Sequence, residues 1–154
     1  MADFTDADRL KKRGRIILPD NPGNLSEDEL SLLENSIKSS VKDGYLSCLS
    51  AWQLAERPGF SRLDAGVMMD RLGVRVKDCQ LGCFKVTKSV RGTADSIIHD
   101  PGIIAGIDAL NSTDTLTCVN IHSLAGQLDL PPMSLMDIVN QKGYKIRNCQ
   151  LGCF

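Results

Sequence analysis

Cysteines are the residues of this sequence best suited to chemistry, and four of the six lie in a hexamer that occurs twice. The letters CQLGCF occupy residues 79–84 and again residues 149–154. Four thiolates form a ligand set that suits zinc or an iron–sulfur cluster. A metal-binding or redox-sensing hypothesis therefore assigns four ligands, Cys79, Cys83, Cys149 and Cys153.

The same hexamer also fits a structural role. Three residues separate the two cysteines of each pair, whereas structural zinc knuckles usually separate their ligands by two. In an extended segment Cys79, Leu81 and Cys83 would share one face, and the thiols would then pack as small hydrophobic groups. We favour this packing role over the metal site, with Phe84 and Phe154 as packing anchors.

Other catalytic signatures are missing from the sequence. Its two histidines, His99 and His122, have no acid–base cluster around them. The sequence contains no Walker loop, no dinucleotide-binding fingerprint and no nucleophile elbow. We therefore expect a protein that is not an enzyme and that carries no cofactor, unless the thiols bind a metal.

The hexamer is the end of a longer internal repeat. A shift of 70 residues aligns residues 45–84 with residues 115–154 without a gap. Outside the hexamer the identical pairs are Leu46 and Leu116, Cys48 and Cys118, Leu54 and Leu124, Ala55 and Ala125, and Gly73 and Gly143. These residues are of core or turn type, so the chain is predicted to contain a duplicated structural unit.

Each copy predicts a helix, a tight turn, a second helix and a short strand. In the first copy, apolar residues at helical spacing predict a helix that ends near Arg57. A second helix is expected between Ser61, as its N-cap, and Gly73, as its C-terminal stop. The alternation in VRVKDC predicts a strand. The second copy repeats the plan with helices over 116–127 and from Pro132, and with YKIRNC as its strand.

A further helix is predicted before each copy. Ser26 and Glu29 form a capping box for an amphipathic helix, and PGIIAGIDAL predicts a shorter one before the second copy. The expected organisation is a flexible basic arm over 1–25, a first repeat unit over 26–84, a linker over 85–101 and a second repeat unit over 102–154.

The helix-turn-helix portions carry a family resemblance. The stretches LSCLSAWQLAERPGFSRLDAGVMMDRLGVRV and LTCVNIHSLAGQLDLPPMSLMDIVNQKGYKI resemble the helix-turn-helix and winged-helix group. The chain is also similar to small, poorly characterised prokaryotic domains with a CQLGCF-type tail, a likeness that supplies no activity. The fold class expected from these patterns is mainly α with short strands (α+β), as two tandem three-helix, helix-turn-helix or winged-helix-like repeats.

The two copies differ in their balance of basic and acidic side chains, and this balance bears on whether each could bind DNA. Residues 45–92 carry eight basic and four acidic side chains, whereas residues 102–154 carry three basic and four acidic ones. Asp64 and Asp70 would oppose base contacts on the expected reading helix of the first copy. The best candidate DNA contacts are Arg62, Arg71, Arg75 and Lys77.

Together these patterns favour a small cytoplasmic DNA-binding transcription regulator of helix-turn-helix type. Its first unit would contact double-stranded DNA, its nearly neutral second unit a protein partner, and its thiols would tune it. The net charge of −1 and the lack of a long apolar run predict no membrane attachment. Two alternatives stay open: a module that binds zinc or an iron–sulfur cluster or senses redox state, and an adaptor that no longer reads DNA. Homo-oligomers are compatible with each.

Overall fold

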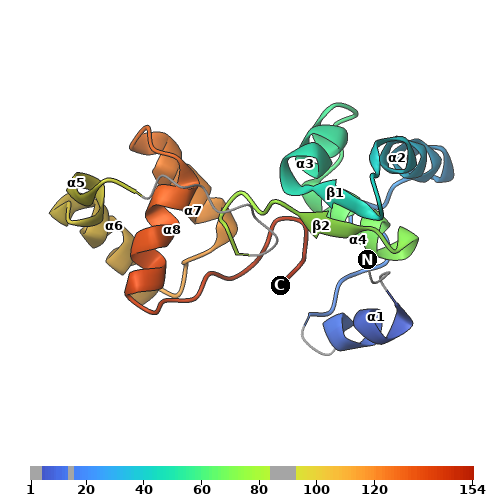
Figure 1. Cartoon of the computed structure of the whole chain (residues 1–154). Helices are drawn as coiled ribbons and strands as arrows, with labels where there is room; N and C mark the ends of the chain where they lie inside the picture. Colours follow the sequence, from blue (N-terminus) through green and yellow to red (C-terminus); the bar gives the residue numbers. More distant parts are fainter. Residues whose placement is uncertain (1–4, 14–15, 84–92) are drawn as a thin grey trace. The chain divides into compact units, whose positions relative to one another are not determined.

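A computed structural model describes residues 5–13, 16–83 and 93–154 (Figure 1). The chain divides into two compact units. Unit 1 comprises Met1–Cys79 together with Gln150–Phe154, and unit 2 comprises Gln80–Cys149. Each unit is described by itself below.

Helices dominate the described residues, and the sheet is small, so the expected mainly α class with short strands is confirmed. In unit 1 the elements are α1 (Asp6–Arg13), α2 (Glu27–Ser40), β1 (Tyr45–Ser47), α3 (Cys48–Glu56), α4 (Arg62–Leu72) and β2 (Arg75–Lys77). In unit 2 they are α5 (Asp95–Ile98), α6 (Pro101–Ser112), α7 (Cys118–Gln127) and α8 (Pro132–Gln141). None of the helices described has the length and apolar character needed to cross a lipid bilayer.

Local capping explains where these helices begin and end. Ser26 and Glu29 form the predicted capping box of α2, and Ser61 and Asp64 form the capping box of α4. Gly73 ends α4 in a left-handed conformation with φ of 71°, which a residue with a Cβ rarely adopts. The sequence therefore specifies the bounds of α4 closely.

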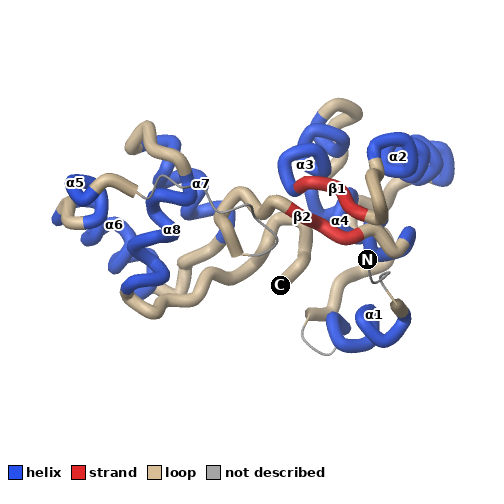
Figure 2. The backbone as a smooth tube through the Cα atoms, viewed as in Figure 1, coloured by secondary structure: helices blue, strands red, loops and turns tan. Residues whose placement is uncertain are grey.

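The strands of unit 1 form a two-stranded parallel sheet (Figure 2). The pairs in register are Tyr45 with Arg75, Leu46 with Val76, and Ser47 with Lys77. At the corresponding place in unit 2 a single parallel bridge joins Thr117 and Arg147. The strand expected from YKIRNC is thus reduced to this one bridge.

Backbone features recur at the 70-residue spacing of the sequence repeat. Positive φ angles occur at Gly44 and Asp114, Gly59 and Asp129, Gly73 and Gly143, Asp78 and Asn148, and Gly82 and Gly152. The hydroxyls of Ser47 and Thr117 cap the helices that follow them. The two copies of the sequence therefore turn in the same way at matching positions.

The compact units divide the two hexamers in an unexpected way. The expected boundaries, 26–84 and 102–154, leave each hexamer with its own copy. In the structure, residues 150–154 belong to unit 1, with most of the first copy, and residues 80–83 belong to unit 2, with the second copy. The segment beyond Cys149 lies against α4 of unit 1 (Figure 1).

A polar cluster joins α6 to the end of α8 in unit 2. Asp108 accepts hydrogen bonds from Lys142 Nζ at 3.0 Å and from the Tyr144 hydroxyl at 2.9 Å. These two donors lower the pKa of Asp108. The same contacts raise the pKa of Lys142 and of Tyr144, in each case chiefly through the hydrogen bond to Asp108.

This cluster predicts a change in the titration of Asp108. Because its pKa is lowered by folding, its contribution to stability is present above the unfolded carboxyl pKa and is lost as the pH falls through the folded value. Lys142→Met should raise the pKa of Asp108 more than Tyr144→Phe does, since the Lys142 hydrogen bond is the largest cause. Carboxyl NMR titration measures this, with Lys145→Met as the control. An unchanged pKa in both variants would contradict the cluster.

Candidate functional site: the covered faces of helix α4

Helix α4 is the second helix of the portion expected from the sequence to resemble a helix-turn-helix, and one side of it faces the core of unit 1. Ala65, Met68 and Met69 are each at most 2% exposed. This burial fixes the helix against α2 and α3, which both contact it. The remaining sides of α4 would be free to contact a ligand only if nothing else in the chain covered them.

The C-terminal segment covers one of those sides. At Gly66 an added Cβ would lie 1.8 Å from the carbonyl oxygen of Leu151, far inside van der Waals contact. Leu151 itself is 1% exposed. Only a residue without a side chain permits this approach of two backbones. Gly66 therefore provides the seat for the segment.

The residues on either side of Leu151 also contact the N-terminal part of unit 1. Arg62 donates a hydrogen bond from Nη1 to Oε1 of Gln150. An added Cβ at Gly152 would lie 2.7 Å from Leu18 and 2.9 Å from Leu63. The segment Gln150–Gly152 is thus held by a polar contact, a backbone contact and an apolar contact in succession.

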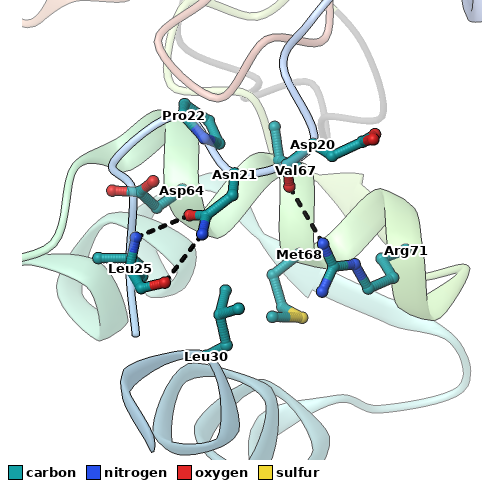
Figure 3. Close-up of a pocket in the computed structure, with 9 residues that line it drawn as sticks. All are labelled: Asp20, Asn21, Pro22, Leu25, Leu30, Asp64, Val67, Met68 and Arg71. Atoms are coloured by element: carbon teal, nitrogen blue, oxygen red, sulfur yellow. Dashed lines mark hydrogen bonds between the residues drawn. The ribbon is translucent and has the colours of Figure 1, made fainter. Parts of the chain in front are cut away.

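The segment before α2 lies against another part of α4, around Asp64, Val67 and Arg71 (Figure 3). The backbone N–H of Gly23 donates to Asp64 Oδ1 at 2.7 Å. Arg71 donates to the backbone oxygen of Asp20 at 3.1 Å. Asn21 closes the turn by exchanging two hydrogen bonds with the backbone of Leu25. A small hollow remains between this turn and α4.

The two acids expected on a reading surface have other roles. Asp64 is 4% exposed and accepts hydrogen bonds from the backbone and hydroxyl of Ser61 as well as from Gly23. Asp70 forms an ion pair with Lys12 of α1. The expectation that these carboxylates lie on an open reading surface was wrong for Asp64, because its carboxylate is buried and is occupied by Ser61 and by the turn before α2.

Helix α1 occupies part of the region expected to be a flexible arm. Asp8 accepts hydrogen bonds from the backbone and hydroxyl of Thr5, each at 2.9 Å, and it pairs with Arg75 at 3.0 Å. The Thr5 backbone hydrogen bond is the largest cause of the lowered pKa of Asp8, and Arg75 adds a smaller attraction. Helix α1 is therefore bound to β2 through Asp8 and to α4 through Lys12.

The four candidate DNA contacts differ in how much of their charge is available. Arg62 stacks over the Trp52 ring at 3.5 Å from its centroid and also pairs with Glu56. Arg75 pairs with Asp8, and Arg71 contacts the backbone of Asp20 although it remains exposed. Lys77, in β2, is half-buried. Three of the four are thus engaged by groups of the same chain.

Unit 2 holds the other hexamer at the matching position. Leu81 is 2% exposed, and an added Cβ at Gly82 would lie 3.7 Å from the side chain of Met133, an ordinary contact distance. Met133 corresponds to Leu63 in the repeat, and Met136, which is buried, corresponds to Gly66. The seat in unit 2 therefore has a methionine where unit 1 has a glycine.

The tail cysteines are divided between the units. Unit 1 contains Cys79, which is buried, and Cys153, which is half-buried. Unit 2 contains Cys83, which is exposed, and Cys149, which is half-buried. None of the six cysteines forms a disulfide.

Within the described ranges, no three His, Cys, Asp or Glu side chains gather as metal ligands would. The zinc and iron–sulfur hypotheses therefore remain predictions that need a metal assay. Phe84, one of the two expected packing anchors, lies outside the described residues, and Phe154 is half-buried.

The sequence patterns did not indicate the residues that make this site. Gly66, Leu18 and Gln150 were not singled out as functional, although each contacts the covered α4 faces or the segment on them. Gly66 carried a usable signal, because glycine inside a helix is unfavourable unless a close approach requires it.

Comparisons with known proteins add no relative. No family model, no curated protein and no solved structure matches the chain.

The packing role of the hexamer predicts unequal costs at its first and second cysteines. Cys79→Ser should lower the free energy of unfolding by on the order of 1–3 kcal/mol, because it replaces the thiol with a more polar hydroxyl at a buried position. Cys83→Ser should change it by less than about 0.5 kcal/mol, because Cys83 is exposed. Urea denaturation measures both. Equal losses, with release of bound zinc or iron from protein purified without oxygen, would support the metal site instead.

The buried carboxylate of Asp64 predicts release of the turn before α2. Asp64→Ala removes the carboxylate that accepts hydrogen bonds from Ser61, which is half of the capping box of α4, and it also removes the acceptor for Gly23, at a cost of about 1–3 kcal/mol. Hydrogen exchange at residues 20–25 should speed up together with exchange in the first turn of α4. The control, Asp70→Ala, should leave residues 20–25 protected. Unchanged exchange in Asp64→Ala would contradict this role.

Proposed function

We propose that the chain is a protein-interaction adaptor built on two units derived from a helix-turn-helix scaffold. Helix α4, which such a scaffold uses to read DNA, instead binds polypeptide segments. The observation that carries this proposal is the close seat of the Leu151 carbonyl on Gly66. A reading helix must present its outer face to a groove, and this face is occupied.

The order of elements supports a helix-turn-helix ancestry. Helix α2, strand β1, helices α3 and α4 and strand β2 follow one another as in a winged-helix unit, and α2, α3 and α4 contact one another. The turn between α3 and α4 spans residues 57–61. The order of elements thus supports the resemblance, while the described contacts on the outer sides of α4 are made to other segments of the same chain.

Electrostatics supports the adaptor as well. Phosphate binding depends on Lys and Arg side chains that can exchange counterions for phosphate oxygens. Arg62 and Arg75 are paired with Glu56 and Asp8, so DNA would have to compete with carboxylates already in contact. This competition lowers the charge available in unit 1.

The adaptor proposal predicts weak and nearly salt-independent association with duplex DNA. Fluorescence anisotropy with a random-sequence duplex at 50 and 200 mM salt measures it. Double substitution of Arg71 and Lys77 by alanine should change little. A fall in affinity of about 10³-fold or more between the two salt concentrations would mean six or more phosphate contacts and would overturn the proposal.

A DNA-binding transcription regulator is the second candidate. The exposed Arg71 and the half-buried Lys77 favour it, since both lie on α4 or β2 at positions expected to approach a duplex. In this case the segment on α4 would have to leave first. The variant Leu151→Asp should then gain salt-dependent DNA binding that alanine at Arg71 and Lys77 removes. No gain in Leu151→Asp would exclude this candidate.

A further inference from the structure

We infer that the face of α4 formed by Leu63 and Gly66 is a binding site for a Gln-Leu-Gly segment supplied by a second copy of the repeat. In this chain the second copy is the C-terminal one, and the segment is Gln150–Gly152. The inference rests on the proposed adaptor function and names its partner. We call this face, completed by Leu18, the α4 groove.

The first support is that the two hexamers are exchanged. Gly152, from the second copy, lies against Leu63 of the first copy. Gly82, from the first copy, lies against Met133 of the second copy, and Met133 is the counterpart of Leu63. Each copy therefore holds the other copy's hexamer at the same position. An accidental contact would not be expected to recur reciprocally.

The second support is that each residue of the segment has a matching group in unit 1. Arg62 binds the amide of Gln150, Gly66 admits the backbone of Leu151, and Leu151 is fully buried. Gly152 has φ of 71°, and a Cβ added there would lie 2.7 Å from Leu18 and 2.9 Å from Leu63, so a larger residue would be strained and would have to displace both leucine side chains. The groove therefore favours Gln, Leu and Gly at these three positions, each through a separate contact.

The two grooves are unequal, and unit 1 has the tighter one. Gly152 is buried, whereas Gly82 is exposed. The difference follows from the residue at the seat, which is Gly66 in α4 and Met136 in α8. A methionine side chain keeps an incoming backbone farther from the helix axis. The groove of unit 1 is therefore expected to distinguish a Gln-Leu-Gly segment from other sequences more sharply than the corresponding face of unit 2.

The partner is a second copy because both hexamers have the same sequence. A groove that fits Gln150–Gly152 must also fit the identical letters at residues 80–82. Within one chain the tether supplies an effective concentration of about millimolar, so the C-terminal copy fills the groove first. Separated copies should associate by the same reciprocal exchange, which is a low-cost route to dimers.

The experiment uses the full chain and two matched substitutions. If the hexamers are exchanged, Leu151→Ala should speed hydrogen exchange in α4 of unit 1 by about tenfold or more and leave α8 unchanged. Leu81→Ala should do the reverse. Faster hydrogen exchange in α8 rather than α4 for Leu151→Ala would overturn the inference. Unchanged exchange in both helices would overturn it as well.

A second measurement tests the partner. A protease site placed in the linker between residues 84 and 92 allows the folded chain to be cut, and the two pieces should stay together in gel filtration at micromolar concentration. Gly66→Met, which copies the residue found in α8, should weaken their association at least tenfold, while Met136→Leu should not. Separation of the unsubstituted pieces would overturn the inference. The DNA measurement is independent, so failure of the adaptor function and failure of this exchange can be told apart.

Discussion

Close backbone contact between Gly66 and Leu151 is the constraint on which unit 1 depends. It requires glycine in the middle of α4, where glycine costs about 1 kcal/mol relative to alanine. That cost is offset because the contact brings Leu151 into the core and presents Gln150 to Arg62. The face of α4 that results is covered by a segment far away in the sequence.

Charge in unit 1 is organised around the same helix. Asp64 and Asp70 neutralise or bind groups from the N-terminal region, and Arg62 and Arg71 bind groups from the segments on either side. In a DNA-binding protein such charged and polar groups would contact phosphates. Here they connect segments of one chain. The small net charge of the protein is consistent with this internal use.

Much of the local structure followed from the sequence, while the partners of the hexamers did not. The capping boxes at Ser26 and Ser61 and the left-handed stop at Gly73 are short-range features, because each depends on residues within a few positions. The exchange of hexamers is different. Identical hexamers look the same in the exchanged and unexchanged arrangements, so sequence periodicity cannot separate the two. The difference between Gly66 and Met136 was the one local hint.

The composition of unit 1 has a consequence for synthesis. N-terminal domains generally fold first as a chain leaves the ribosome, but unit 1 contains residues 150–154. Its α4 groove must wait, with Gly66 and Leu63 uncovered, until the whole of unit 2 has been made. Unit 2, whose residues run without interruption from 80 to 149, has all its parts earlier. The half of the protein that is translated first is therefore the half that is finished last.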